Sequence, residues 1–187
     1  MAQRLLIIAH ATTPANVALI FGDPGKPHLG EVRRLNGHVK SWVSGPEEAC
    51  TATAVQLGGQ PEPLPDLREC DFGEWSSRGL IDVVTEDPSA VDSWLHDPYA
   101  APHGGESLAK LITRVGAVLD DHPWPQGRSV AVVMPLVARA AAVHALGAAP
   151  EVIFRIDMAP LGRVLISRSD HMWRLRSLVA TPKEPRR

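Results

Sequence analysis

Two short apolar runs stand out along the chain because each is bounded by polar or turn-forming residues. Residues 5–8 read Leu-Leu-Ile-Ile, and residues 129–134 read Ser-Val-Ala-Val-Val-Met. Continuous apolar runs of this length predict strands that are buried on both faces, as in a parallel sheet. The first run leads through Ala9 to His10, and α/β domains place their chemistry at the ends of such strands. His10 is therefore the first candidate functional residue, with a purely structural role at the strand end as the alternative.

The helices are predicted from a different spacing of apolar residues. Between residues 106 and 121, apolar side chains recur at intervals of three and four residues, which predicts an amphipathic helix packed on a core. This stripe consists of Leu108, Leu111, Ile112, Val115, Val118 and Leu119. Glu106 is expected in the first turn, at the positive end of the helix dipole. Pro135 suits the first turn of a further helix, and Gly147 suits its end.

The rest of the chain is expected to form shorter elements. Helical segments are predicted over residues 14–21, 29–39, 47–57, 80–84 and 89–95, and a short strand over residues 40–46. Residues 58–66, rich in Gly and Pro, predict a loop that leads into an extended segment at 67–70. Two alternating stretches around Ser169, Asp170 and His171 predict a hairpin across residues 162–179.

The order of these elements predicts the fold class. Strands that alternate with helices favour a three-layer α/β/α domain with a mostly parallel central sheet. The hairpin adds an antiparallel edge to this sheet near the C-terminus. We expect one domain over residues 1–180 and a disordered tail over residues 181–187.

Composition narrows the range of partners. A net charge of −2 and a sequence pI near 6.4 give no overall positive field to hold nucleic acid or an anionic membrane. No apolar run is long enough for a signal peptide or a membrane span. The two cysteines lack the spacing of a zinc site or a disulfide framework, which favours a cytoplasmic location. The expected partner is a small molecule, and a homodimer stays open.

Four segments of the chain carry polar residues in an order that is typical of one family. They read AHATTPAN from residue 9, LRECDFGEW from residue 67, PHGGESL from residue 102 and VVMPLVARA from residue 132. In this order they resemble the motifs of the histidine phosphatase superfamily, the phosphoglycerate-mutase-like proteins. The resemblance extends over about residues 3–178 and implies the fold of that family and a phosphomonoester hydrolase activity.

The resemblance also implies roles for individual residues. His10 falls on the nucleophile of the family, and Glu69 falls on its proton donor. By position, the substrate-binding set comprises Thr13, Asn16, Asp71, Met134 and Arg139. In the mechanism this implies, a neutral imidazole attacks phosphorus, a carboxylic acid protonates the leaving oxygen, and water hydrolyses the phosphohistidine.

Three positions depart from the family pattern where the phosphoryl oxygens should be held. Ala9 and Ala49 stand at the positions of two arginines, and Met134 stands at the position of a second catalytic histidine. Catalysis of phosphoryl transfer depends on such cations and donors, and losing one typically costs about 10²–10³ in rate. The sequence therefore predicts that phosphatase activity is weak or lost, as in a pseudoenzyme.

Other groups are candidates to replace the lost phosphate ligands. Arginines near the motifs are Arg33, Arg34, Arg78 and Arg139, although a solvated surface position is the favoured interpretation of each. A divalent cation held by His10 with Glu69 or Asp71 is conceivable, but the histidines lack metal-ligand spacing, and no metal or cofactor is expected. Glu48, beside Ala49, together with Glu69 is expected to make the pocket more negative than a phosphate site should be.

Two alternatives to a phosphatase stay open. In the first, the fold serves as a non-catalytic binding module. In the second, His10 and Glu69 act as an acid/base pair on a neutral or cationic small molecule, as in an isomerase, dehydratase or cyclase. Trp75, Trp94 and Tyr99 are candidates for the mouth of the pocket, with ordinary packing as the alternative. Most other histidines, His103 among them, are expected at the surface.

Overall fold

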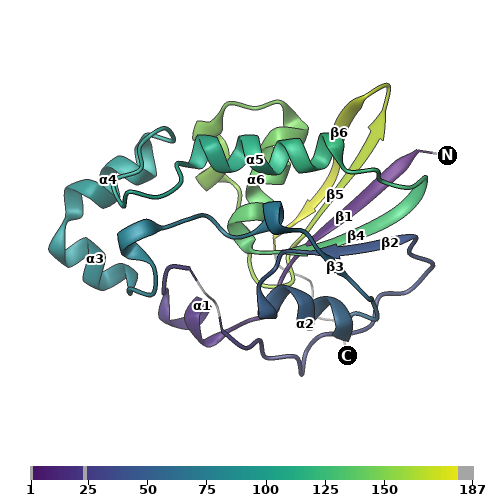
Figure 1. Ribbon diagram of the computed structural model, residues 1–187, viewed down its shortest axis with the longest axis horizontal. Helices are drawn as coiled ribbons and strands as arrows, with labels where there is room; N and C mark the ends of the chain where they lie inside the picture. Colours follow the sequence, from purple (N-terminus) through teal and green to yellow (C-terminus); the bar gives the residue numbers. More distant parts are fainter. Residues whose placement is uncertain (1, 23–24, 181–187) are drawn as a thin grey trace.

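The computed structural model describes residues 2–22 and 25–180, and it shows one central sheet with helices on both faces (Figure 1). The strands are β1 (Gln3–Ala9), β2 (Ser41–Ser44), β3 (Glu62–Pro63), β4 (Gly127–Val133), β5 (Arg163–Ser169) and β6 (Met172–Val179). The α-helices are α1 (Pro14–Ala18), α2 (Glu48–Gln56), α3 (Leu80–Glu86), α4 (Pro88–His96), α5 (Leu108–Asp121) and α6 (Pro135–Leu146). Short 3₁₀ helices occupy Pro65–Leu67, Gly73–Trp75 and Pro150–Arg155.

The sheet has the strand order β3-β2-β4-β1-β5-β6. The strands β3, β2, β4 and β1 run parallel, whereas β5 is antiparallel to β1 and β6 is antiparallel to β5. The predicted fold class, a mostly parallel sheet with an antiparallel edge near the C-terminus, is therefore confirmed.

The two apolar runs form the centre of this sheet. Leu6 pairs with Val130 and Ala9 pairs with Val133, so β1 and β4 end at the same level. The backbone N–H of His10 extends the pairing by donating to the carbonyl of Val133 at 3.0 Å. Both strands are buried because helices cover both faces of the sheet, and this pairing brings position 10 next to position 134.

The helices divide into three groups in space. Helices α5 and α6 lie over one face of the sheet, and α2 lies over the other (Figure 1). The apolar stripe of α5 is confirmed, since Leu111, Val115 and Leu119 are buried against the core. Helices α3 and α4 lie beyond the carboxyl ends of the parallel strands, at the left of Figure 1, and α1 lies at the same end.

Two predictions for the first half of the chain are wrong. Residues 29–39 form no helix, and their apolar side chains, such as Val32, pack on the core from an irregular backbone that Gly37 turns with a φ of +88°. The predicted loop 58–66 contains β3, and a 3₁₀ helix follows at Pro65–Leu67, after which Arg68 has the expected extended backbone. Tertiary contacts act on both segments: the N–H of Leu35 donates to the carbonyl of Leu57, and the N–H of Leu64 donates to the carbonyl of Ser44 at the edge of the sheet.

The later elements agree with the sequence except at one helix end. Helix α5 begins after Ser107, whose Oγ accepts from the N–H of Lys110 at 3.3 Å, so Glu106 precedes the helix instead of lying in its first turn. Helix α6 begins at Pro135 and ends at Gly147, which has a φ of +59°, and the hairpin is formed by β5 and β6. The tail predicted over residues 181–187 lies outside the described residues. Within residues 2–22 and 25–180, the helices are too short or too polar to traverse a bilayer.

Candidate functional site

His10 lies directly after β1 with its ring fully buried, at 0% exposure. Its Nδ1 contacts the carbonyl oxygen of Ala11 at 2.6 Å, which is a hydrogen bond if Nδ1 carries the proton. Burial lowers the pKa of His10, and the contact with Ala11 acts in the opposite direction. The ring is therefore a neutral imidazole at pH 7, with its lone pair on Nε2. This nitrogen is buried without a hydrogen-bond partner in the described part of the chain.

The second predicted catalytic residue, Glu69, lies in the segment between the first two 3₁₀ helices. Its backbone N–H donates to Oε1 of Glu47 at 2.6 Å, and its own Oε1 accepts from the N–H of Cys70 at 2.8 Å. Burial is the largest cause that raises the pKa of Glu69 to about 8, and the negative charges of Glu47 and Glu106 add to it. The hydrogen bond from Cys70 and the charge of Arg114 act in the opposite direction. At pH 7 the carboxyl group is largely protonated, as a general acid requires.

Arg114 of α5 fixes the position of this segment. Its Nε and Nη2 bind both carboxylate oxygens of Glu106, at 2.8 and 2.6 Å. Its Nη1 donates to the carbonyl oxygens of Asp66 and Arg68 at 2.8 and 3.1 Å, and its Nη2 donates to that of Glu69 at 3.3 Å. Arg114 was not among the residues predicted from the sequence, because no local pattern indicates that its side chain reaches a loop more than 40 residues away.

A cavity of about 210 Å³ opens where α1, α4, α6 and the segment of Glu69 meet. Four of the predicted site residues line it: Asn16, Glu69, Met134 and Arg139. The other lining residues are Ala15, Ile20, Phe21, Gly22, Phe72, Trp94, Pro135, Leu136 and Phe154. The wall is therefore mainly apolar, and His10 is not part of it.

Two of the predicted binding residues hold the local backbone instead of lining the cavity. Thr13 is the N-cap of α1, and its Oγ1 accepts from the N–H of Asn16 at 3.2 Å. Oδ1 of Asn16 in turn accepts from the N–H of Thr13 at 3.2 Å. Asp71 is exposed, and its carboxylate accepts from the N–H of Gly73 at 2.9 Å. A substrate-binding role for Thr13 and Asp71 stays a prediction.

The three positions that are predicted to depart from the family motif are buried. Ala9 and Ala49 are 0% exposed, and Met134 is 3% exposed. Near Ala49, Oγ1 of Thr53 accepts from the N–H of Ala11 at 3.0 Å and donates to the carbonyl of Ala49 at 2.6 Å. This link fixes the start of α2 against the loop that follows His10.

Arg139 is the only lysine or arginine that lines the cavity among the described residues. Its Nε is buried without a hydrogen-bond partner, and no carboxylate of the described chain lies within salt-bridge distance of it. Burial lowers the pKa of Arg139, while the charges of Asp157 and Glu69 act in the opposite direction. A guanidinium stays charged at neutral pH in proteins, so Arg139 is an unpaired cation in the wall.

The other arginines that the sequence offered as replacements lie elsewhere. Arg33 is exposed and donates to the carbonyl of Gly30, and Arg78 pairs with Glu86. Arg34 lies against Gly58, at the end of α2. None of the three lines the cavity.

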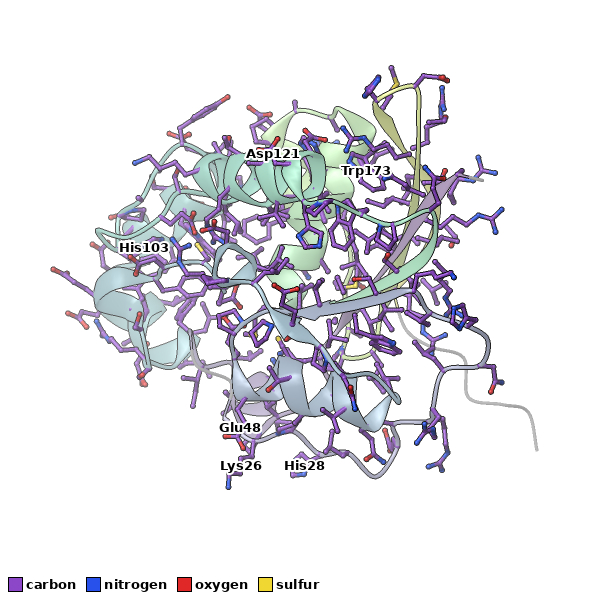
Figure 2. The ribbon with its side chains drawn as sticks, turned by 45° about the vertical axis from the view of Figure 1, so that its right-hand side comes forward. Lys26, His28, Glu48, His103, Asp121 and Trp173 are labelled. Carbon is purple, nitrogen blue, oxygen red and sulfur yellow. The ribbon has the colours of Figure 1, made fainter. Side chains whose placement is uncertain are left out.

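The expected negative group beside Ala49 is Glu47 and not Glu48. Glu48 is exposed, and its side chain lies on the outer side of α2 (Figure 2). Glu47 instead turns towards the segment of Glu69, and its Oε1 accepts from the backbone N–H of Glu69. Neither Glu47 nor Glu48 lines the cavity, so a more negative pocket stays a prediction.

Aromatic side chains close one side of the cavity. Trp94 lines it, whereas Trp75 packs beside it and Tyr99 is 68% exposed. His103, which was expected at the surface, is fully buried, and its Nδ1 accepts from the N–H of Gly105 at 3.1 Å. Its ring contacts Phe72 and Trp75 with centroids 5.9 and 5.0 Å apart.

No three His, Cys, Asp or Glu side chains of residues 2–22 and 25–180 are placed to hold a metal ion. The combination of His10 and Glu69 with Asp71 therefore provides no ready metal site, since Asp71 is turned to Gly73. The cavity therefore has a protonated carboxyl group and one unpaired guanidinium in its wall, and the neutral imidazole of His10 lies outside that wall.

Comparison with known proteins identifies the family. The histidine phosphatase superfamily (branch 1) matches residues 5–181. The chain belongs to this superfamily. A glucosyl-3-phosphoglycerate phosphatase of Mycobacterium tuberculosis is 26% identical over 167 residues, which are 79% of this chain and 75% of that protein. The native structure of a mycobacterial glucosyl-3-phosphoglycerate phosphatase superimposes with a TM-score of 0.78 at 22% identity, over 97% of this chain and 100% of that one.

A bifunctional protein of Mycobacterium tuberculosis is 30% identical over 127 residues, or 60% of this chain. The chain spans only about a third (35%) of the length of this and the other first curated relatives, which are mycobacterial. The related phosphatase has also been solved in complex with inorganic phosphate.

Proposed function

We propose that this chain is a small-molecule-binding member of the histidine phosphatase superfamily in which hydrolysis through phospho-His10 is weak or lost. The observation that carries this proposal is the state of three positions in the motifs. Where the family pattern has two arginines and a histidine, this chain has Ala9, Ala49 and Met134, all of them buried. Among the described residues, the cavity beside them contains one cation, Arg139.

Two groups support a residual hydrolase. With Nδ1 turned to Ala11, Nε2 of His10 carries the lone pair that a nucleophilic imidazole needs to attack phosphorus. Glu69, with a pKa of about 8, has a proton to give to the leaving oxygen as the ester P–O bond breaks. Water then cleaves the phosphorus–nitrogen bond, releases phosphate and restores His10. These groups are sufficient for the bond changes of a phosphomonoesterase.

The charges at the site argue against an efficient phosphomonoesterase. A phosphomonoester carries nearly two negative charges at pH 7, and this negative charge is still present in the transition state. Each missing donor typically costs about 10²–10³ in rate, and three are missing, although such effects do not simply add. Glu47 brings a negative group close to the position of the missing arginine. His10 also lies outside the wall of the cavity, so a bound ester has no open path to Nε2 there.

The acid/base alternative has less support than a binding role. The raised pKa of Glu69 and the apolar wall suit acid catalysis on a neutral molecule. An acid/base pair needs both groups at one substrate, however, and of the two only Glu69 lines the cavity. We therefore place binding first.

A hydrolysis assay tests the proposal. Para-nitrophenyl phosphate is offered to the protein between pH 5 and pH 8, with the His10→Ala variant as the control and the mycobacterial glucosyl-3-phosphoglycerate phosphatase as the reference. We expect a kcat/KM at least about 10³ below the reference, given the missing donors. A value within tenfold of the reference that is lost in His10→Ala contradicts the proposal.

A second variant makes the test sharper. Met134→His returns one donor next to His10 without a large change in volume, but leaves both arginines absent. We expect it to raise the His10-dependent rate by no more than about tenfold, because one donor cannot hold three phosphoryl oxygens. An increase of about 10³ would show that the phosphate site is otherwise intact.

A further inference from the structure

Four aromatic rings form a continuous wall of the cavity. Phe21, Phe72, Trp94 and Phe154 all line it. The centroids of Phe21 and Phe72 are 5.0 Å apart, those of Trp94 and Phe154 are 5.0 Å apart, and Trp94 lies 5.9 Å from Phe21. Aromatic rings prefer flat partners that meet their edges or faces in this range of distances. This wall suits a planar ring better than the polyhydroxylated body of a sugar phosphate.

The polar side chains that line the cavity are Asn16, Glu69 and Arg139, and Arg139 is the one cation among the described lining residues. Its Nε is buried without a hydrogen-bond partner in the described residues, and no carboxylate there forms a salt bridge with it. A charged guanidinium beside apolar side chains favours an anionic partner. We therefore expect the ligand to carry a negative group.

We propose that the cavity binds an aromatic monoanion, a single planar ring that carries one carboxylate. The ring lies against the wall of Phe21, Phe72, Trp94 and Phe154, and the carboxylate binds the guanidinium of Arg139. This inference rests on the proposed function, because it fills the same cavity and names the class of small molecule.

The charges around the cavity favour a ligand with one negative charge over a ligand with two. A carboxylate matches the fork of a guanidinium and leaves no charge unpaired. The second negative charge of a phosphomonoester finds no further cation among the described residues of the cavity, and the acidic side chain of Asp157 lies near Arg139. An organic cation suits an aromatic wall in general, but here it faces the positive charge of Arg139.

The size of the cavity agrees with this class of ligand. Benzene occupies cavities of about 150 Å³ in proteins. The cavity here measures about 210 Å³, which leaves room for one ring and one carboxylate. A two-ring nucleoside or a sugar-linked ester would extend beyond it.

Calorimetric titration with benzoate tests the inference. Phenyl phosphate, cyclohexanecarboxylate and benzyltrimethylammonium serve as comparison ligands, each differing from benzoate in charge or in ring planarity. We expect saturable binding of benzoate with a Kd of about 1 mM or tighter, the range open to a ligand of its size. We expect all three comparison ligands to bind more weakly than benzoate.

Single substitutions separate the contributions of Arg139 and Trp94 to benzoate binding. Arg139→Gln is expected to weaken benzoate at least tenfold, and Arg139→Lys to weaken it less because the charge remains. Trp94→Leu is expected to remove most of the preference for benzoate over cyclohexanecarboxylate. Arg33→Gln, at an exposed residue that donates to Gly30, is the matched control and should leave binding unchanged.

The outcomes distinguish this inference from the proposed function. Absence of benzoate binding, or binding that Arg139→Gln leaves unchanged, overturns the inference. Tighter binding of phenyl phosphate or of the ammonium ligand also overturns it, while leaving a binding role intact. Efficient hydrolysis of para-nitrophenyl phosphate through His10 contradicts the proposed function, whatever benzoate does.

Discussion

The carboxylate of Glu47 accepts a hydrogen bond from the backbone N–H of Glu69 at 2.6 Å, which joins the start of α2 to the segment of the candidate acid. The charge of Glu47 is one cause of the raised pKa of Glu69. The start of α2 thus favours a protonated Glu69.

The first prediction concerns the pH dependence that Glu69 gives to stability. Its pKa rises from 4.5 to about 8 on folding, so the folded state holds a proton that the unfolded state has lost between these values. The contribution of Glu69 is fully present below pH 4.5 and is lost as pH rises to about 8. The slope is at most about 1.4 kcal/mol per pH unit.

Glu69→Gln should remove this slope. Urea unfolding at several pH values from 5 to 9 is the measurement, and the variant should gain stability over the natural protein as pH rises. Glu74→Gln, at an exposed residue of the following 3₁₀ helix, is the control. Parallel pH curves for all three proteins would show that Glu69 titrates normally.

The second prediction concerns Arg114 and Glu106, which are 13% and 10% exposed in their side chains. Arg114→Met leaves the Glu106 carboxylate unpaired and removes the donor to three carbonyl groups. We expect a loss of about 3–5 kcal/mol in the free energy of unfolding. Arg68→Met, which breaks an exposed contact of 3.6 Å with Asp66, should cost less than about 1 kcal/mol.

A double variant shows where the cost arises. Arg114→Met combined with Glu106→Met removes the unpaired charge, so it should be more stable than Arg114→Met alone. If the double variant is instead the less stable of the two, the loss comes from packing and not from the charge.

The third prediction concerns Thr53, which links α2 to the loop after His10. Thr53→Val keeps the shape of the side chain but leaves the N–H of Ala11 buried without an acceptor. The expected cost is about 1–3 kcal/mol by denaturant unfolding. Thr51→Val on the same helix is the control, because Oγ1 of Thr51 contacts only carbonyls of its own helix start. Equal losses in the two variants would rule out a special role for Thr53.

The fourth prediction compares two glycines that both have positive φ. Gly147, at +59°, ends α6 and has open space where the Cβ of an alanine would lie, so Gly147→Ala should cost about 1–2 kcal/mol from the backbone alone. At Gly73, with a φ of +46°, a Cβ would lie 2.1 Å from the carbonyl oxygen of His103. Gly73→Ala should therefore cost about 3 kcal/mol or more. Thermal unfolding that ranks them in reverse order would contradict this packing.

Much of the fold followed from local patterns. The runs that became β1 and β4 were clear because both faces of these strands are buried, and α5 was clear because one stripe faces the core. The segment at residues 29–39 was misread because its apolar spacing resembles a helix, while its backbone is shaped by contacts with the core and α2. Strand β3 has two residues, and only its pairing with β2 makes it a strand.

The candidate site shows the same division. Of the residues that the sequence predicted for the site, Asn16, Glu69, Met134 and Arg139 line one cavity, because the motifs lie at strand ends and helix starts that meet there. It did not identify the wall of Phe21, Phe72 and Phe154, since these rings come from three separate segments and meet only in the folded chain.

The sequence by itself determined the superfamily and most of the order of elements, because both depend on residue types in order along the chain. Only the tertiary structure decided that His10 is excluded from the cavity, that Glu47 and not Glu48 faces Glu69, and that Arg139 is left without a partner among the described residues. Charge, burial and the pKa of Glu69 depend on which side chains approach from distant segments. The distances between such side chains arise from tertiary packing, so local sequence patterns do not predict them.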